Sequence, residues 1–154
     1  MNVFKRKERG AWIAAGILSV LIMGGCATTF KYSFDTKTDF AEQKSYAWAP
    51  SSSLSQPDHL LETNVQDLAD QLLAQKGFTR VSEQSELVIT MNYESDSYGT
   101  RSSYRLRMLN LNIYQTGNKE LVWRGTAFGT IDTDAASSDL KQAVEGILSN
   151  FPPK

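Results

Sequence analysis

Two alternating segments joined by a short turn constrain the fold of this chain most strongly. Residues 104–114 and 120–131 alternate between apolar and polar side chains with a period of two, which is typical of half-buried strands. The predicted turn between them, residues 115–118, includes Gly117 and Asn118, which suit the positive φ angles of a tight hairpin turn. The two segments are therefore predicted to pair as a long antiparallel hairpin.

The apolar residues of the first strand change phase partway along it. Those before the change share one parity and those after it share the other: Tyr104, Leu106 and Met108, then Leu109, Leu111 and Ile113. Because a slip of one residue exchanges the two faces of a strand, we expect a β-bulge near Met108 and Leu109. In the return strand, Gly125 and Gly129 lie on the apolar parity, where they leave room for a helix or mark another bend.

Three further strands are expected before the hairpin. Residues 27–38 and 86–93 alternate clearly, and residues 44–48 form a shorter segment that ends at Trp48. Residues 94–103 have no periodicity and are rich in serine and glycine, so we expect an exposed, mobile loop there.

Two amphipathic helices complete the pattern. In residues 58–77 the apolar side chains recur at helical spacing, Asp58 suits the N-cap, and Gly77 suits the C-terminal stop. The acids of this helix, among them Glu62 and Asp70, are expected to face water. Residues 139–150 form the second helix, which Pro152 ends. The predicted fold is α+β, an antiparallel sheet of about five strands with both helices packed on one face.

The start of the chain has the three parts of an export signal. Four basic residues lie within the first ten, an apolar run extends from Ala11 to Gly25, and Cys26 follows directly. The run of 15 residues is short for a membrane span, which needs about 20. The sequence before Cys26 is similar to a bacterial lipobox, so we expect residues 1–25 to be removed and Cys26 to be lipidated, leaving one domain at residues 26–154.

Three alternatives to this lipid anchor stay open. Cleavage after Ala27 would give a soluble exported protein, and an uncleaved leader would give an N-terminal anchor because residues 10–27 reach the lower limit for a span. A buried core helix is a third interpretation, although the adjacent basic cluster opposes it. Cys26 is the only cysteine, so no disulfide can form within the chain, and lipidation would remove a lone thiol from an oxidising compartment.

The charge of the expected domain argues against nucleic acid as a partner. Removal of residues 1–25 leaves 12 basic and 16 acidic residues, a net charge of −4, whereas nucleic-acid binding needs a basic face. The expected partners are instead the membrane, through Cys26, and an envelope protein or an anionic lipid.

Few residues of the sequence suggest a catalytic, metal or ligand site. His59 is the only histidine, so neither a zinc site nor a Ser-His-Asp arrangement has its usual residues, and we expect an exposed or capping role. Trp48 and Trp123 could line a sugar site, but at strand spacing they are more typical of a core. Gly125 and Gly129 precede no helix, so they form no phosphate cradle. No cofactor, metal site or catalytic residue is predicted.

A basic set is the more distinctive feature. Arg105 and Arg107 share a parity on one predicted strand, Arg124 could lie across from them, and Arg101 precedes them. Such a surface could bind anionic lipid headgroups or an acidic partner, although a solvated sheet face is the plainer explanation.

Four segments, in order along the chain, resemble a bacterial lipoprotein family known only as domain of unknown function 4136. They are Asp39-Phe40 with Lys44-Ser45-Tyr46-Ala47-Trp48, then residues 72–78, 121–127 and 143–152. The resemblance implies a lipid-anchored protein of the Gram-negative envelope and brings no activity, cofactor or catalytic residue.

Two functional hypotheses follow. The first is a non-catalytic lipoprotein of the outer membrane, facing the periplasm, whose polar sheet face or 94–103 loop binds another envelope component. Ala27 after the cysteine, in place of aspartate, favours the outer membrane. The second is a small envelope hydrolase that uses paired carboxylates, for which two acids should converge in a concave pocket with at least one of them buried.

Overall fold

The hairpin expected from the sequence lies inside a six-stranded sheet with the strand order β1-β6-β5-β4-β2-β3. The computed structural model describes residues 28–50, 57–96, 104–134 and 137–153. Within them the strands are β1 (Thr29–Phe34), β2 (Ser45–Trp48), β3 (Thr79–Arg80), β4 (Leu87–Ser95), β5 (Arg105–Gln115) and β6 (Leu121–Asp132), and the helices are α1 (His59–Gln75) and α2 (Ser138–Leu148).

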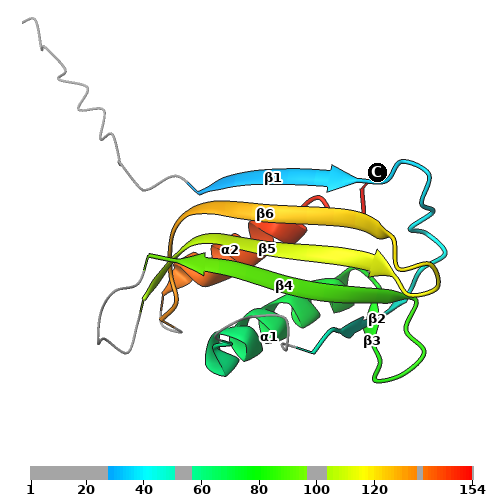
Figure 1. Ribbon diagram of the computed structural model, residues 1–154, viewed down its shortest axis with the longest axis horizontal. Helices are drawn as coiled ribbons and strands as arrows, with labels where there is room; N and C mark the ends of the chain where they lie inside the picture. The colour runs from blue at the N-terminus through cyan, green and yellow to red at the C-terminus, as the bar shows by residue number, and fades with distance from the viewer. Residues whose placement is uncertain (1–27, 51–56, 97–103, 135–136, 154) are drawn as a thin grey trace, which may run out of the picture.

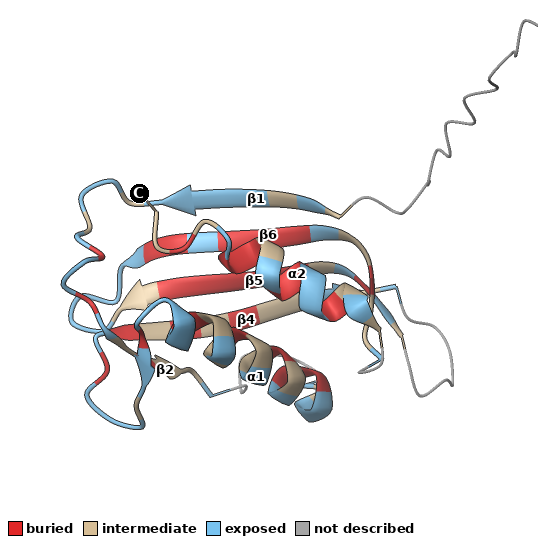
Figure 2. Cartoon of the chain, turned by 180° about the vertical axis from the view of Figure 1, so that it is seen from behind, coloured by how far each residue is buried: buried red, intermediate tan, exposed pale blue. Residues whose placement is uncertain are grey.

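Both helices lie on the same side of the sheet (Figures 1 and 2). Helix α2 crosses behind β6 and β5 in Figure 1, and α1 lies beside it, behind and below β4. Their ends follow the sequence signals. The carboxylate of Asp58 caps α1, the hydroxyl of Ser137 caps α2, and Gly77 adopts φ +86° after α1. The α+β class predicted from the sequence is confirmed.

The sheet is mixed and has one strand more than predicted. Strand β2 pairs parallel to β4, from Tyr46 opposite Leu87 to Trp48 opposite Ile89, and it also pairs parallel to β3. The expectation of an antiparallel sheet of about five strands is therefore met only in part, because β1, β6, β5 and β4 pair antiparallel whereas β2 pairs parallel with β4 and β3. The reason is that α1 follows β2 and returns the chain to the end where β2 began, so the next long strand must run in the same direction. Strand β3 is only two residues long, too short to show a period.

The expected bulge is present, slightly earlier than predicted. The register of β5 against β6 shifts between Leu106 and Met108, and Gly129, on the facing stretch of β6, has φ +154°. The turn differs from the prediction, because the positive φ falls on Lys119 (+60°) and neither Gly117 nor Asn118 has one. The Lys119 N–H donates to the Gln115 carbonyl at 2.9 Å, so the turn spans residues 115–119, one residue longer than the predicted 115–118.

The core lies between the sheet and the helices. Strand residues of one parity meet the apolar side of α2, which supplies Leu140, Ala143, Val144, Ile147 and Leu148. Gly125 allows this close packing, since a Cβ there would overlap the indole ring of Trp123 and lie 2.9 Å from Cγ2 of Ile147. The room for a helix that the sequence predicted at Gly125 is thus taken up by α2 and by Trp123.

Candidate functional site

The opposite side of the sheet carries no helix in the described part of the chain (Figure 1). At its centre, neighbouring strands place polar side chains side by side. The Arg124 Nε donates to Oδ1 of Asn112 at 2.7 Å, and the Asn112 amide reaches the Thr90 hydroxyl at 3.4 Å. In the next row, the Asn110 amide donates to the Thr126 hydroxyl at 2.6 Å. We call this surface the open face.

The polar groups of the open face are held rigidly. Asn112 is only 4% exposed and Asn110 only 8%, although no helix covers them. Their hydrogen bonds therefore fix side chains that would otherwise rotate in water. Arg124 is exposed, and its bond to Asn112 uses Nε, so the two terminal nitrogens remain for another group.

A second cation lies beside Arg124. Lys31 on β1 is opposite Thr126, two pairs along from Ser33, which is opposite Arg124. Diagonal neighbours of this kind lie roughly 7–8 Å apart. The Lys31 Nζ also sits 5.3 Å from the ring centroid of Phe128.

The residues directly opposite the two cations, Ser33, Thr126 and Asn112, are uncharged. The other diagonal neighbour of Arg124 is the acid Asp35, whose carboxylate accepts hydrogen bonds from Lys37 and Thr38. Lys31 and Arg124 therefore form a small cationic site on this part of the open face.

The structure does not bring the predicted basic set together. Arg105 lies opposite Asp132, while Arg124 lies opposite Asn112, seven residues further along β5, or about 24 Å at the rise of a strand. Arg107 forms an ion pair with Asp96 at 2.8 Å. The expectation that Arg124 lies across from Arg105 and Arg107 is wrong, because strand register was not determined by the sequence pattern.

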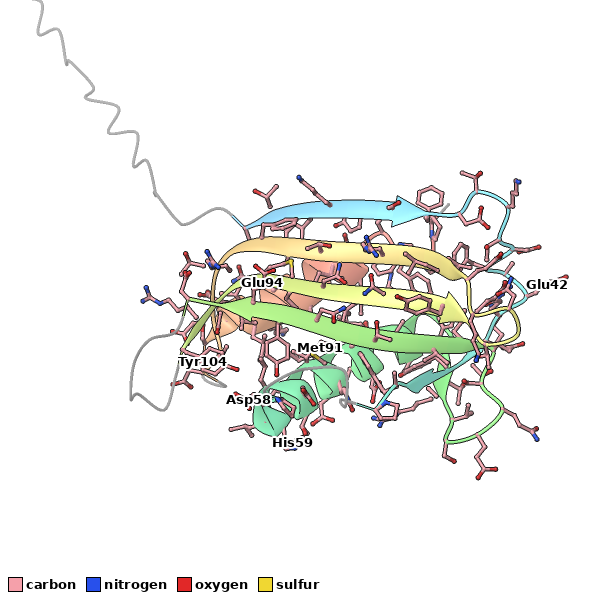
Figure 3. The ribbon with its side chains drawn as sticks, viewed as in Figure 1. Glu42, Asp58, His59, Met91, Glu94 and Tyr104 are labelled. Atoms are coloured by element: carbon pink, nitrogen blue, oxygen red, sulfur yellow. The ribbon has the colours of Figure 1, made fainter. Side chains whose placement is uncertain are left out.

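A second polar cluster lies at the start of α1, at the same end of the molecule as Glu94 (Figure 3). Oδ1 of Asp58 accepts the N–H groups of Leu60 and Leu61 at 3.0 Å, and Oδ2 accepts the Tyr104 hydroxyl at 2.7 Å. Burial alone would raise the pKa of Asp58, but these hydrogen bonds outweigh it and hold the pKa below its usual value. Asp58 is thus an ionised capping group.

Glu62 lies one turn further along α1, and its predicted exposure to water is wrong. It was expected to face water, yet it is 4% exposed and accepts the Tyr93 hydroxyl at 3.3 Å. The same hydroxyl accepts the backbone N–H of Asp58 at 2.7 Å. Two acids therefore converge at the entrance of α1, one of them buried.

Asp70 is the other acid expected to face water, and it is only partly exposed. Its Oδ1 accepts the Tyr46 hydroxyl at 2.6 Å and the Trp48 Nε1 at 2.9 Å, and its Oδ2 pairs with Arg80 at 2.8 Å. Burial, followed by the bond to Asp70, raises the pKa of Tyr46. This carboxylate joins α1 to β2 and β3, so we assign it a structural role.

The remaining candidates occupy ordinary positions. His59 is exposed, and its Nδ1 lies 3.9 Å from the Glu62 carboxylate. Trp123 is fully buried, as a core residue should be, and Trp48 is partly buried against the core. Among residues 28–50, 57–96, 104–134 and 137–153, no group of three His, Cys, Asp or Glu side chains could hold a metal ion.

Two of the hollows on the described surface lie away from Asp58, Glu62 and Arg124. One, of about 360 Å³, lies where α1 meets the start of α2 and is lined by Asp67, Leu68, Leu140 and Lys141 among others. The other, of about 490 Å³, lies beyond the end of β1 among Phe34, Lys44, Lys76, Phe78 and the final prolines. Neither brings two buried titratable groups together.

Several predicted features lie outside the described residues. They are the leader at residues 1–25, the lipidation site Cys26, Arg101, and positions 97–103 of the predicted loop. In the part of the chain that the structure describes, no helix is both long and apolar enough to cross a membrane.

The comparisons identify a family and a fold. The family model described as "Domain of unknown function (DUF4136)" matches residues 30–153. Comparison with curated proteins gave no significant match. A DUF4136 family protein from Bacteroides thetaiotaomicron shares the fold with a TM-score of 0.55 and 12% identity, over 80% of this chain and 94% of that one.

Two further solved structures share the fold. The PelC dodecamer from Paraburkholderia phytofirmans has a TM-score of 0.57 and 15% identity, over 80% of this chain and 96% of that one. A PDZ domain protein from Parabacteroides distasonis has a TM-score of 0.61 and 16% identity, over 81% of this chain. The match covers only 35% of that longer protein. At these identities the likeness concerns the fold alone.

Proposed function

The chain belongs to the DUF4136 family of unknown function, and from that premise we propose that it is a lipid-anchored, non-catalytic binding module of the bacterial cell envelope. In this proposal residues 1–25 are removed, Cys26 carries the lipid, and residues 26–154 face the periplasm from the outer membrane. The basic start, the short apolar run and the lone cysteine support the anchor.

The length of the tether supports a fixed orientation. Three residue steps separate Cys26 from Thr29, where β1 begins, and an extended chain covers about 10 Å in that distance. The end of the sheet at which β1 starts would then lie next to the membrane. The open face would run away from the membrane along β1, with Lys31 closer to it than Arg124.

The single observation that carries the binding role is the guanidinium of Arg124, oriented by the buried Asn112 on an uncovered sheet face. A guanidinium held in place loses little conformational entropy on binding, and its terminal nitrogens match a carboxylate or a phosphate in a fork. With Lys31 beside it, the site suits a partner that presents two negative charges. We propose an acidic segment of another envelope protein, with anionic lipid as the competing outcome.

The anchor is tested by Cys26→Ser. Acyl labelling should disappear and the domain should leave the membrane fraction, because only the lipid holds it there. A variant that stays with the membrane at the size of the processed protein would contradict the anchor. Lys76→Ser, a change on the exposed surface far along the chain, serves as the control and should leave fractionation unchanged.

The binding surface is tested by photo-crosslinking in intact cells. A photoreactive residue at Ser33, directly across from Arg124, should join the protein to a partner, and Arg124→Gln should reduce that product several-fold. The matched control carries the same photoreactive residue in place of Glu145, which is exposed on α2. A lipid adduct at position 33 would assign the surface to anionic lipid, and equal products at both positions would contradict the proposal.

The convergence of Asp58 and Glu62 favours one second candidate, a small envelope hydrolase. Against it, both carboxylate oxygens of Asp58 already accept hydrogen bonds from within the protein. The test is release of soluble fragments from isolated envelope polymers by the purified protein. Activity that Glu62→Gln abolishes, with the fold intact, would replace the binding proposal by the enzyme.

A further inference from the structure

Strand β1 is an edge strand with one side free in the described part of the chain. The sheet order places β6 on one side of it and no strand on the other (Figure 2). Its register with β6 runs without a shift from Thr29 to Phe34, and the strand contains no proline. Natural edge strands are usually protected by bulges, prolines or a covering segment, and a regular edge without them is a site for pairing with another strand.

The backbone groups that face this free edge can be identified. The Asp35 N–H bonds the Val122 carbonyl directly across from it at 2.9 Å. In an antiparallel ladder hydrogen-bonded pairs alternate with non-bonded pairs, so the bonded positions on β1 are the odd-numbered ones. The N–H and C=O groups of Phe30, Tyr32 and Phe34 therefore point to the free edge.

The side chains at those three positions are all aromatic and lie on the helix side of the sheet, opposite Ala127, Gly125 and Trp123. Tyr32 is 36% exposed and Phe34 40% exposed, and they are two of the five large apolar side chains exposed in the described structure. The Tyr32 hydroxyl bonds the Gly146 carbonyl at 2.5 Å and so fixes the ring at the edge. Backbone groups that point to the free edge and exposed aromatic rings thus coincide on β1.

The sequence of the strand is nearly symmetric about Tyr32: aromatic residues at 30, 32 and 34 alternate with Lys31 and Ser33. We propose that β1 pairs antiparallel with β1 of a second copy, about a two-fold axis at Tyr32, so that the two sheets become one. This pairing uses the backbone groups along the free edge of β1, not the side chains of the open face. It therefore goes beyond the binding role proposed above.

The symmetry determines the register. An axis at Tyr32 sets Tyr32 against Tyr32 and Phe30 against Phe34 of the second copy, and each such bonded pair exchanges two hydrogen bonds. It also sets Lys31 opposite Ser33. Of the two nearest alternative registers, the one with its axis at Lys31 would place two lysines directly opposite each other, which is destabilising. The one with its axis at Ser33 would set Lys31 opposite Asp35 but would leave Phe30 opposite Thr36, beyond the end of β1. Only the axis at Tyr32 pairs all three aromatic positions, and it gives an isologous interface.

Disulfide trapping in the membranes of cells that express the full chain tests the pairing and its register. Opposed positions lie about 4.5–5.5 Å apart between Cα atoms, within the range of a disulfide. Tyr32→Cys alone should give a covalent dimer on mild oxidation. Lys31→Cys and Ser33→Cys, expressed together with different tags, should join to each other, while each alone stays monomeric because its own copy lies roughly 7–8 Å away on the diagonal.

The first control is the unaltered chain, which shows whether Cys26 alone gives a covalent dimer. The second is Glu83→Cys, at an exposed position beyond the opposite edge of the sheet. If Tyr32→Cys fails to fold, as circular dichroism would reveal, the 31 and 33 pair still tests the proposal with Tyr32 in place. A stronger dimer from Lys31→Cys alone than from the mixed pair would overturn the register. No dimer from the mixed pair, or one that Glu83→Cys equals, would overturn the interface.

Discussion

The Nε of Arg124 lies 2.7 Å from Oδ1 of Asn112, so an exposed guanidinium is oriented by an amide that is almost fully buried. Removal of Arg124 leaves that amide oxygen without its donor, which costs about 1–3 kcal/mol. We expect Arg124→Ala and Asn112→Ala each to destabilise the fold, and the double variant to cost less than their sum. Urea unfolding of the four proteins measures this coupling.

Additive effects in that cycle would contradict the proposed orientation of Arg124. Arg105→Ala is the matched control, because Arg105 is an exposed arginine on the same strand as Asn112. Its effect on the free energy of unfolding should stay within about 0.5 kcal/mol.

Gly125 has no room for a methyl group. A Cβ there would overlap Cη2 of Trp123 and lie 2.9 Å from Cγ2 of Ile147, both in the core. We expect Gly125→Ala to destabilise the protein by about 1–3 kcal/mol through overpacking, measured by urea unfolding. Gly117→Ala has open space around its Cβ and should be nearly neutral. Equal effects of the two changes would mean that helix α2 does not pack as described.

Much of the fold could be predicted because its signals are local. The alternation of residues 104–131, the Asp58 cap and the stop at Gly77 each depend on a few neighbouring residues, and all three are present. The parallel pairing of β2 with β4 was missed because it depends on where α1 returns the chain. Register is equally non-local, which is why Arg124 and Arg105 were expected together.

The acids of α1 show the same limit for the site. Helical periodicity assigns Glu62 and Asp70 to the polar side, and the sequence gives no indication that Tyr93, Tyr46 and Trp48 would reach them from other elements. The buried amides of the open face were also unforeseen, since alternation predicts only which side of a strand a residue faces. In both cases the missing information is the position of a partner distant in sequence.

Asp58 should make folding stability depend on acid pH. Its folded pKa is held below the unfolded value of about 3.9, so its contribution is complete above that value and is lost as the pH falls through the folded pKa. Asp58→Asn keeps a good N-cap but removes the charge. We expect the variant to be less stable than the unaltered protein at pH 7 and the difference to vanish near pH 2, as thermal unfolding would show. A constant difference across that range would contradict the assignment.

Asp70 should be the most sensitive polar residue of α1. Asp70→Ala would leave the Tyr46 hydroxyl, in a residue that is 2% exposed, without its acceptor, and would free Trp48 and Arg80. Because an unsatisfied buried hydroxyl costs about 1–3 kcal/mol, we expect a loss of at least that size in urea unfolding. Asp67→Ala, the removal of an exposed acid one turn earlier, should change the free energy of unfolding by less than about 0.5 kcal/mol.

Tyr46→Phe separates the contribution of the buried hydroxyl from that of Trp48 and Arg80. If the hydroxyl dominates, the double variant Asp70→Ala/Tyr46→Phe should be less destabilised than Asp70→Ala alone. A double variant that is more strongly destabilised would mean that the ion pair with Arg80 or the bond to Trp48 holds β2 and β3 against the helix.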